Sequence, residues 1–282
     1  MIKLLKDLTS VQEVVKELNI IDDTLFQKMA EDTEFCEEMI STIFGKKVTV
    51  RDVTPQNSVK NLQGRSVVLD ALCVLDDEKE CCVEVQKADD DDHQRRVRYN
   101  ASCVTANITE PGTRFKVVPN VCVIYITKFD IFQDGKTVYH IDRVVRETGQ
   151  KVDNGLQEIY VNTKIDDGTE VAELMHIFTV KDAYDFEKFP KISERKKQFK
   201  ESEGGQGEVC ELVENYARQC AEKAAKEAAK EAAKEAAKDN ARRLFENGAS
   251  YEMVRASITL LSDEELQKIF SERRNPTNKE GS

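Results

Sequence analysis

Three polar residues inside two apolar segments are the clearest candidates for chemistry in this sequence. Asp70 interrupts one strand-like apolar run, and Glu84 and Gln86 lie in the next. A carboxylate in an apolar strand is costly unless a cation pairs with it. Two such carboxylates, close in sequence and separated by a polar turn, therefore predict a metal-binding pair.

The two acids converge only if the strands pair in one particular register. Alternate residues of a strand share a face, and a shift of one residue moves every side chain to the opposite face. A two-residue turn at Asp77–Glu78 would place Asp70 opposite Val85 and separate the acids. An odd-length loop or a bulge would place Asp70 opposite Glu84 or Gln86. The sequence leaves this choice open, so a hairpin with one solvated face is the alternative.

The other face of the hairpin is entirely apolar and is expected to pack on a helix. Its residues are Leu69, Ala71, Cys73 and Leu75 in the first run and Cys81, Val83 and Val85 in the second.

The order of these residues resembles the signature of the PD-(D/E)XK nucleases, an acid followed on the next strand by acid-x-Lys. Gln86 stands where lysine is usual, but one branch of that superfamily, the transposase-associated, recombination-promoting nucleases, carries Glu-x-Gln. Further segments resemble that branch, and together they span roughly residues 20 to 270. They are residues 22–29 with 34–45, 95–99, 189–201 and 241–253.

This resemblance implies an α/β fold with a restriction-endonuclease-like αβββαβ core. It also implies a metal-dependent DNA endonuclease that hydrolyses phosphodiester bonds in transposition or recombination. The resemblance assigns the catalytic roles to Asp70, Glu84 and Gln86. The motif gives much weaker support to an accessory role for Asp22 or Asp23.

Oxygen ligands suit Mg²⁺ or Mn²⁺ at such a site, and the predicted ligands are Asp70, Glu84 and the backbone carbonyl of Val85. The metal would lower the pKa of a bound water and stabilise charge on the scissile phosphate. Gln86 adds no positive charge, so a Gln86→Lys substitution is expected to preserve or raise activity. The neutral residue also keeps a second hypothesis open, a catalytically inactive nuclease-like module that binds DNA or a protein.

Two basic clusters are candidate DNA contacts, and each could equally be a solvated face. The first contains Arg95, Arg96 and Arg98, and the second includes Lys196 and Lys197. The net charge of −11 argues against indiscriminate affinity for DNA, but local clusters decide phosphate contacts.

The composition places the chain among proteins without membrane segments. None of its apolar runs approaches the roughly 20 residues that span a bilayer. The N-terminal 15 residues lack the apolar region of a secretory signal, so a cytoplasmic location is expected. The eight cysteines form no Cys-x-x-Cys pair and are predicted to be reduced and buried. A homo-oligomer is left open.

The hydrophobic pattern predicts the order of the elements. Helices are expected over residues 9–45, 92–108 and 171–186, and strands over 47–54, 67–75, 80–86, 117–127, 137–141 and 158–165. Asp22–Asp23 are a candidate start for a second helix within residues 9–45. Gly45 should end this helical region and Pro55 the first strand.

Three parts are predicted along the chain. Residues 1–203 form the nuclease-like domain, 204–240 an Ala/Glu/Lys-rich helical spacer, and 241–282 a small helical tail with a disordered end. The glycines at 204, 205 and 207 predict a flexible break.

Overall fold

A computed structural model describes residues 11–59, 66–76, 79–89 and 92–272 of the chain. The chain divides into two compact units, residues 1–214 and 215–282, and helix α8 (Glu203–Glu246) contributes to both. The candidate site lies in the first unit. The predicted division into nuclease domain, spacer and tail remains a prediction.

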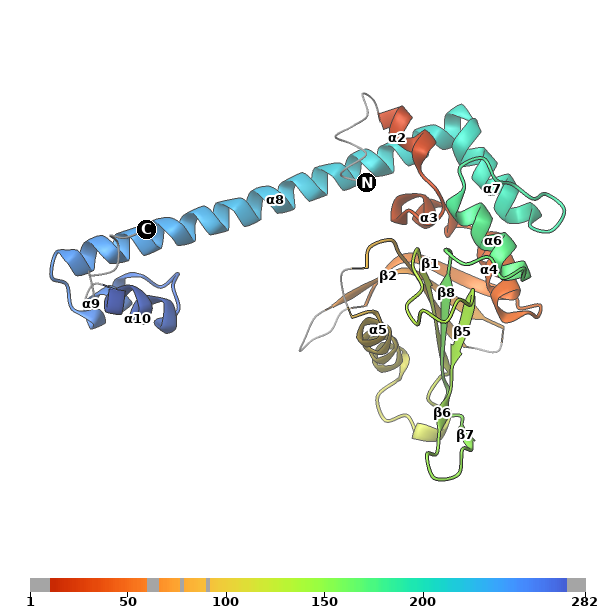
Figure 1. Ribbon diagram of the computed structural model, residues 1–282, viewed down its shortest axis with the longest axis horizontal. Coiled ribbons are helices and arrows are strands. Elements are labelled where there is room, and N and C mark those ends of the chain that lie inside the picture. The colour runs from red at the N-terminus through yellow and green to blue at the C-terminus, as the bar shows by residue number, and fades with distance from the viewer. Residues whose placement is uncertain (1–10, 60–65, 77–78, 90–91, 273–282) are drawn as a thin grey trace. The chain divides into compact units, whose positions relative to one another are not determined.

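The first unit is built on a six-stranded mixed sheet with the order β1-β2-β3-β4-β8-β5 (Figure 1). The strands β1, β2 and β3 are antiparallel, β3, β4 and β8 are parallel, and β5 pairs with β8 in the antiparallel sense. Their bounds are β1 Val50–Val59, β2 Val67–Leu75, β3 Glu80–Gln86, β4 Val121–Thr127, β5 Val138–Ile141 and β8 Leu156–Asn162. A short hairpin of β6 (Arg143–Val144) and β7 (Lys151–Val152) extends from the sheet.

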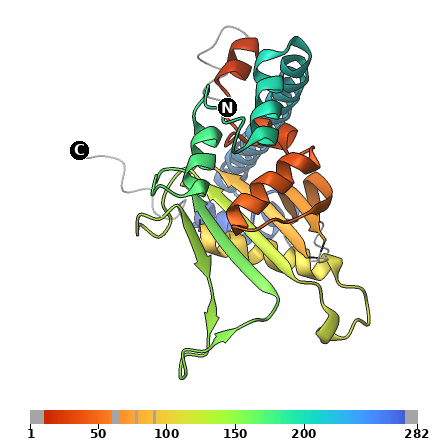
Figure 2. The same ribbon diagram turned by 90° about the vertical axis from the view of Figure 1, so that its right-hand side faces the viewer.

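Helices cover both faces of this sheet (Figures 1 and 2). Helix α5 (His93–Ile108) packs on one face through Val97, Ala101 and Val104. On the other face, α3 (Asp23–Met29) and α4 (Thr33–Phe44) contact the sheet. Helices α2 (Val11–Glu17), α6 (Glu170–Thr179) and α7 (Pro190–Glu201) pack in the same apolar cluster. Every residue of β4 is buried, as its continuous apolar run predicts. The predicted α/β class with C-terminal helices is confirmed, and the arrangement is consistent with the PD-(D/E)XK fold.

The sequence-based boundaries at the N-terminal side hold in part. The second helix starts at Asp23, at the candidate position, and Gly45 ends the helical region with φ 62°, but the break between α3 and α4 was not predicted. Pro55 does not close the first strand but lies inside β1. Proline is tolerated there because β1 is an edge strand, paired only with β2, so one side of its backbone needs no sheet partner.

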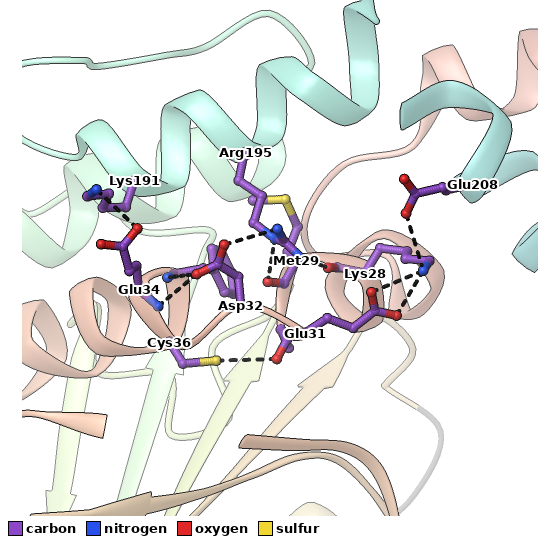
Figure 3. A network of polar contacts seen from close by, with 11 residues as sticks. Lys28, Met29, Glu31, Asp32, Glu34, Cys36, Lys191, Arg195 and Glu208 are labelled. Carbon is purple, nitrogen blue, oxygen red and sulfur yellow. Dashed lines mark hydrogen bonds and ion pairs between the residues drawn. The ribbon is translucent and has the colours of Figure 1, made fainter. Parts of the chain in front are cut away.

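Arg195 of α7 fixes the turn between α3 and α4 (Figure 3). Its guanidinium donates to the backbone carbonyls of Met29 at 2.9 Å and Lys28 at 2.8 Å, and it pairs with the Asp32 carboxylate at 3.0 Å. Asp32 also accepts from the backbone N–H of Glu34 and so caps α4. The five donors of arginine suit this branched arrangement. It holds α3 against the sheet.

Two lysines of α7 are directed inward. Lys196 is fully buried, and its ammonium donates to the carbonyls of Ile177, Val180 and Ala183 at the end of α6. Lys200 is 7% exposed, and its ammonium donates to carbonyls at the C-terminal end of α2, including that of Leu18 directly after the helix. Burial lowers the pKa of each to about 8. A DNA contact would require Lys196 to leave three partners, so we do not retain it as a DNA-binding residue.

The second unit contains the remainder of α8 with α9 (Tyr251–Ser257) and α10 (Asp263–Glu272). The helix is continuous through the Lys-Glu-Ala-Ala repeat, as alanine and long charged residues predict. A small apolar core joins the three helices, formed by Ala241, Phe245, Val254, Leu261, Leu266 and Ile269. None of the helices in the described part of the chain is both long and apolar enough to cross a bilayer.

The flexible break predicted at residues 204–207 is wrong, because these residues belong to α8. Gly205 is explained by packing instead of by flexibility. A Cβ atom at this position would lie 2.8 Å from the Gln198 carbonyl carbon and 2.9 Å from the Phe199 Cα atom. The glycine therefore lets the start of α8 approach the backbone of α7 closely.

Substitution of Gly205 by alanine is expected to destabilise the first unit by about 1–3 kcal/mol, because the added methyl group meets backbone that cannot yield easily. Gly207→Ala is the matched control, since a Cβ atom there meets nothing within 4 Å. It should leave stability unchanged or raise it by up to about 1 kcal/mol through helix propensity. Urea unfolding followed by circular dichroism measures both, and equal effects would contradict this packing.

Candidate active site

The β2–β3 hairpin has the register that brings the two acids together. Ala71 pairs with Val83 and Val74 pairs with Glu80, and the Leu75 N–H donates to the Lys79 carbonyl. Three residues therefore form the loop between positions 75 and 79. Continuing the same register by one residue places Asp70 opposite Glu84. Of the two registers that the sequence leaves open, the odd-length loop is the one adopted.

The hairpin opens at Asp70. The regular β2–β3 pairing ends at Ala71 and Val83, and on the other side of β2 the residue facing Asp70 is Gln56, which has a φ of 49°. Past this point Leu69 packs in the cluster beneath α5 and not with Ala71, so the prediction that it shares the face of Ala71 is wrong. The physical reason is that the regular pairing of β2 with β3 ends here, so the residues before Ala71 no longer follow the same alternation of faces.

The Asp70 side chain, and not a β2 backbone carbonyl, is the hydrogen-bond partner of β3 at this point. Its Oδ2 atom accepts a hydrogen bond from the backbone N–H of Val85 at 2.8 Å. The N–H and C=O of one strand residue point to the same edge of the strand. The Val85 carbonyl therefore faces the same edge as Asp70, where a metal ligand is predicted.

Both carboxyl groups have raised pKa values, and burial is the main cause for each. Burial raises the pKa of Asp70 to about 7, and the negative charge of Asp23 adds to this. Burial also raises the pKa of Glu84, which is 8% exposed, and the nearby Asp70 charge is the next cause. The Arg96 guanidinium opposes the rise at both groups but does not cancel it.

A hard divalent cation fits this donor set. Asp70 and Glu84 present carboxylate oxygens whose mutual repulsion a cation would relieve. Mg²⁺ commonly takes only one or two protein carboxylates and completes its shell with water and phosphate oxygens. Among the described residues no group of three or more His, Cys, Asp or Glu side chains is arranged to hold a metal. The site would therefore depend on two carboxylates and main-chain oxygen.

Gln86 joins β3 to helix α5. Its Oε1 atom accepts from the Arg96 Nη1 atom at 2.7 Å, and its Nε2 atom donates to the Ala88 carbonyl at 2.9 Å. Asp92 caps α5 by accepting from the Arg95 N–H at 3.0 Å, which sets where the helix begins. The cap thereby fixes the position of Arg96, one turn into the helix.

A hollow of about 630 Å³ lies between Glu84 and the start of α5. Arg95, Arg96 and Arg98 line it, as do Val67 and Val68 of β2. A second hollow of about 450 Å³ shares Arg95 and Arg98 with it and extends toward Arg143. Of the candidate acids, Glu84 therefore opens onto a surface where arginines gather.

The accessory acids of the first helix differ from each other. Asp22 is buried, accepts from the Asn19 N–H at 2.8 Å and forms an ion pair with Lys87. It is therefore engaged in holding the chain before α3. Asp23 has a pKa raised by desolvation and by the Asp22 charge, and its own charge acts on Asp70. Of the two, Asp23 has the stronger link to the site.

Sequence reasoning missed two features around the site. Lys87 directly follows Gln86 and forms an ion pair with Asp22. Its position next to the Glu-x-Gln motif could have marked it as a residue near the site. Tyr125 is the β4 partner of Glu84, and its hydroxyl lies 3.0 Å from the Nδ1 atom of the buried His93. Only the parallel pairing of β3 and β4 reveals this neighbour, because Tyr125 lies in a wholly apolar run.

The remaining predicted residues lie apart from this hollow. Lys197 is exposed on α7, in the helix layer on the face opposite to α5, and its ammonium lies 3.9 Å from Glu201. Six of the seven cysteines with described side chains are buried, as predicted.

A comparison with protein-family models identifies the class to which the fold and the paired acids point. The model of the PD-(D/E)XK nuclease family transposases matches residues 24–247, which is most of the chain. The chain belongs to this family, which implies a nuclease linked to transposition. No curated protein and no solved structure matches it.

The raised pKa of Asp70 predicts how this residue affects stability in the metal-free protein. A carboxyl group with a folded pKa of about 7 and an ordinary unfolded pKa destabilises the fold as it ionises, progressively from about pH 4 to 7. Asp70→Asn should therefore be more stable than the parent at pH 8. The expected gain is about 1–3 kcal/mol, because partial exposure of Asp70 lets solvent screen part of the effect. The advantage should vanish near pH 4.

Urea unfolding at both pH values measures this difference, with Asp134→Asn on an exposed loop as the control. Addition of Mg²⁺ should stabilise the parent and not Asp70→Asn. If the difference in stability between the parent and Asp70→Asn were the same at pH 4 and pH 8, ionised Asp70 would not destabilise the fold and this prediction would be wrong.

Proposed function

We propose that this protein is a metal-dependent DNA endonuclease that hydrolyses phosphodiester bonds in transposition or recombination. The observation that carries the proposal is the placement of Asp70 beside β3, where it accepts from the Val85 N–H and its charge acts on Glu84, which lines an arginine-rich hollow. An uncompensated acid pair of this kind is expensive in a structural hairpin and is useful for binding a cation.

The roles of the residues follow from their positions. Asp70, Glu84 and the Val85 carbonyl would hold Mg²⁺ or Mn²⁺, which supplies Lewis acidity and an activated water at neutral pH. The Val85 N–H orients the Asp70 carboxylate through the 2.8 Å hydrogen bond. Asp23 adds negative charge close to Asp70 and is an accessory residue of the site.

The DNA backbone is proposed to lie along the start of α5. Arg95 and Arg98 are exposed there and line both hollows, so their charges are available to phosphates. Lys197 remains a candidate contact on a different surface. A second copy of the chain is compatible with this arrangement, and DNA is the partner for which the site itself argues.

Plasmid cleavage in the presence of Mg²⁺ or Mn²⁺ is the first test. The parent should nick or linearise plasmid DNA, and cleavage should stop when the metal is chelated. Asp70→Asn and Glu84→Gln should each lower the rate by about 10³-fold or more, because each removes a ligand charge. Both variants should retain the circular dichroism spectrum of the parent.

A folded parent that binds DNA without cutting it under any divalent metal would instead support the alternative function, a catalytically inactive module. If Asp70→Asn cut DNA as fast as the parent, the proposed site would be wrong even though the protein is a nuclease.

The location of the DNA is tested by its salt dependence. Arg98→Gln should weaken binding of a short duplex and reduce the slope of log K against log [salt] by about 1, because one phosphate contact is lost. Fluorescence anisotropy in the Asp70→Asn background measures binding without cleavage. Lys197→Gln is the matched variant, and a larger loss for Lys197→Gln would move the DNA to α7.

A further inference from the structure

Gln86 is engaged at both ends of its amide. The carbonyl oxygen Oε1 accepts from Arg96, and the amide nitrogen Nε2 donates to the Ala88 carbonyl. This orientation follows from chemistry, since a guanidinium can only donate and a backbone carbonyl can only accept. Each end of the amide keeps one further hydrogen-bonding position, so these contacts do not prevent Gln86 from binding a water molecule as well. Its observed contacts indicate that it holds Arg96 in place.

Arg96 is the cation whose charge acts to lower the pKa of both Asp70 and Glu84. It is half-buried, it lines the same hollow as Glu84, and its charge acts on both Asp70 and Glu84. Its neighbours on α5, Arg95 and Arg98, are exposed, so Arg96 differs from them in burial and in its link to β3. The three arginines are therefore not equivalent phosphate contacts.

We propose that Arg96 contacts the scissile phosphate and supplies the positive charge that the residue at position 86 lacks, while Gln86 is the positioning residue that fixes its guanidinium. This inference rests on the proposed nuclease function. The planar fork of a guanidinium suits two phosphate oxygens. A positive charge held in place beside Glu84 would stabilise charge that develops during hydrolysis.

The contact between Arg96 and Gln86 changes the expectation for a lysine at position 86. A lysine there cannot accept a hydrogen bond and would place a second cation beside Arg96. From the sequence alone Gln86→Lys should preserve or raise activity. The structure predicts that it lowers activity while Arg96 is present, and that it restores activity when Arg96 has been replaced by a neutral residue.

A double-mutant cycle on plasmid cleavage tests this proposal. Arg96→Gln should lower kcat by about 10²-fold or more. Arg96→Lys, which keeps the charge without the fork, should lie between Arg96→Gln and the parent. The double variant Gln86→Lys/Arg96→Gln should cleave at least about 10-fold faster than Arg96→Gln alone, because the charge is restored from β3. A purely structural Arg96 would not be rescued by a lysine on another element.

Two further readouts separate the role of Arg96 from affinity and folding. Arg98→Gln should act mainly on KM and on duplex affinity, whereas Arg96→Gln should act mainly on kcat. The urea midpoint of the double variant should match that of Arg96→Gln, so that any recovered activity is not recovered stability.

The outcomes distinguish this proposal from the nuclease function. If the parent cleaves DNA and Arg96→Gln keeps the parental kcat, or the double variant is no faster than Arg96→Gln, the role of Arg96 is wrong and the nuclease function stands. If the parent cleaves no DNA with Mg²⁺ or Mn²⁺, both fail together. If Arg96→Gln does not fold, the test uses Arg96→Lys and Gln86→Lys instead. The proposal is overturned if Arg96→Lys has the parental kcat and Gln86→Lys has the parental activity.

Discussion

The burial of two carboxyl groups, Asp70 and Glu84, on neighbouring strands is the constraint on which the candidate site depends. Burial raises the pKa of both groups, and the Asp70 charge raises that of Glu84 further. A structural hairpin would avoid this cost with a neutral residue at either position. Its presence is understandable if a cation completes the site, which links the energetics of the metal-free fold directly to the family's nuclease chemistry.

The surroundings of the acid pair reduce this cost only in part. The hairpin opens at Asp70, which gives its carboxylate the Val85 N–H as a partner. Helix α5, begun by the Asp92 cap, brings Arg96 from the opposite side of the site and ties it to Gln86. These contacts orient the groups without neutralising both charges. The arrangement is the expected one for a site that must bind a metal ion and still release a charged product.

Two cations of α7, Lys196 and Arg195, maintain the frame of the unit through contacts with backbone carbonyls. Lys196 and Arg195 donate to backbone carbonyls at the ends of helices, and thereby fix α6 and the turn between α3 and α4. In sequence these residues belong to a basic cluster that resembles a phosphate-binding surface. Their carbonyl partners lie 13 or more residues away along the chain, so no local pattern could distinguish a buried cap from an exposed contact.

The sequence by itself determined the strands and the identity of the acids. Apolar runs interrupted by polar turns fixed the bounds of β2 and β3, because alternation and turn chemistry are local properties. The tertiary structure decided the hairpin register, the place of Pro55 in an edge strand and the use of Gly205 in helix packing. It also decided which arginine reaches Gln86. Each of these depends on which distant segments pair, and pairing energies are summed over the whole core and are not encoded in any one segment.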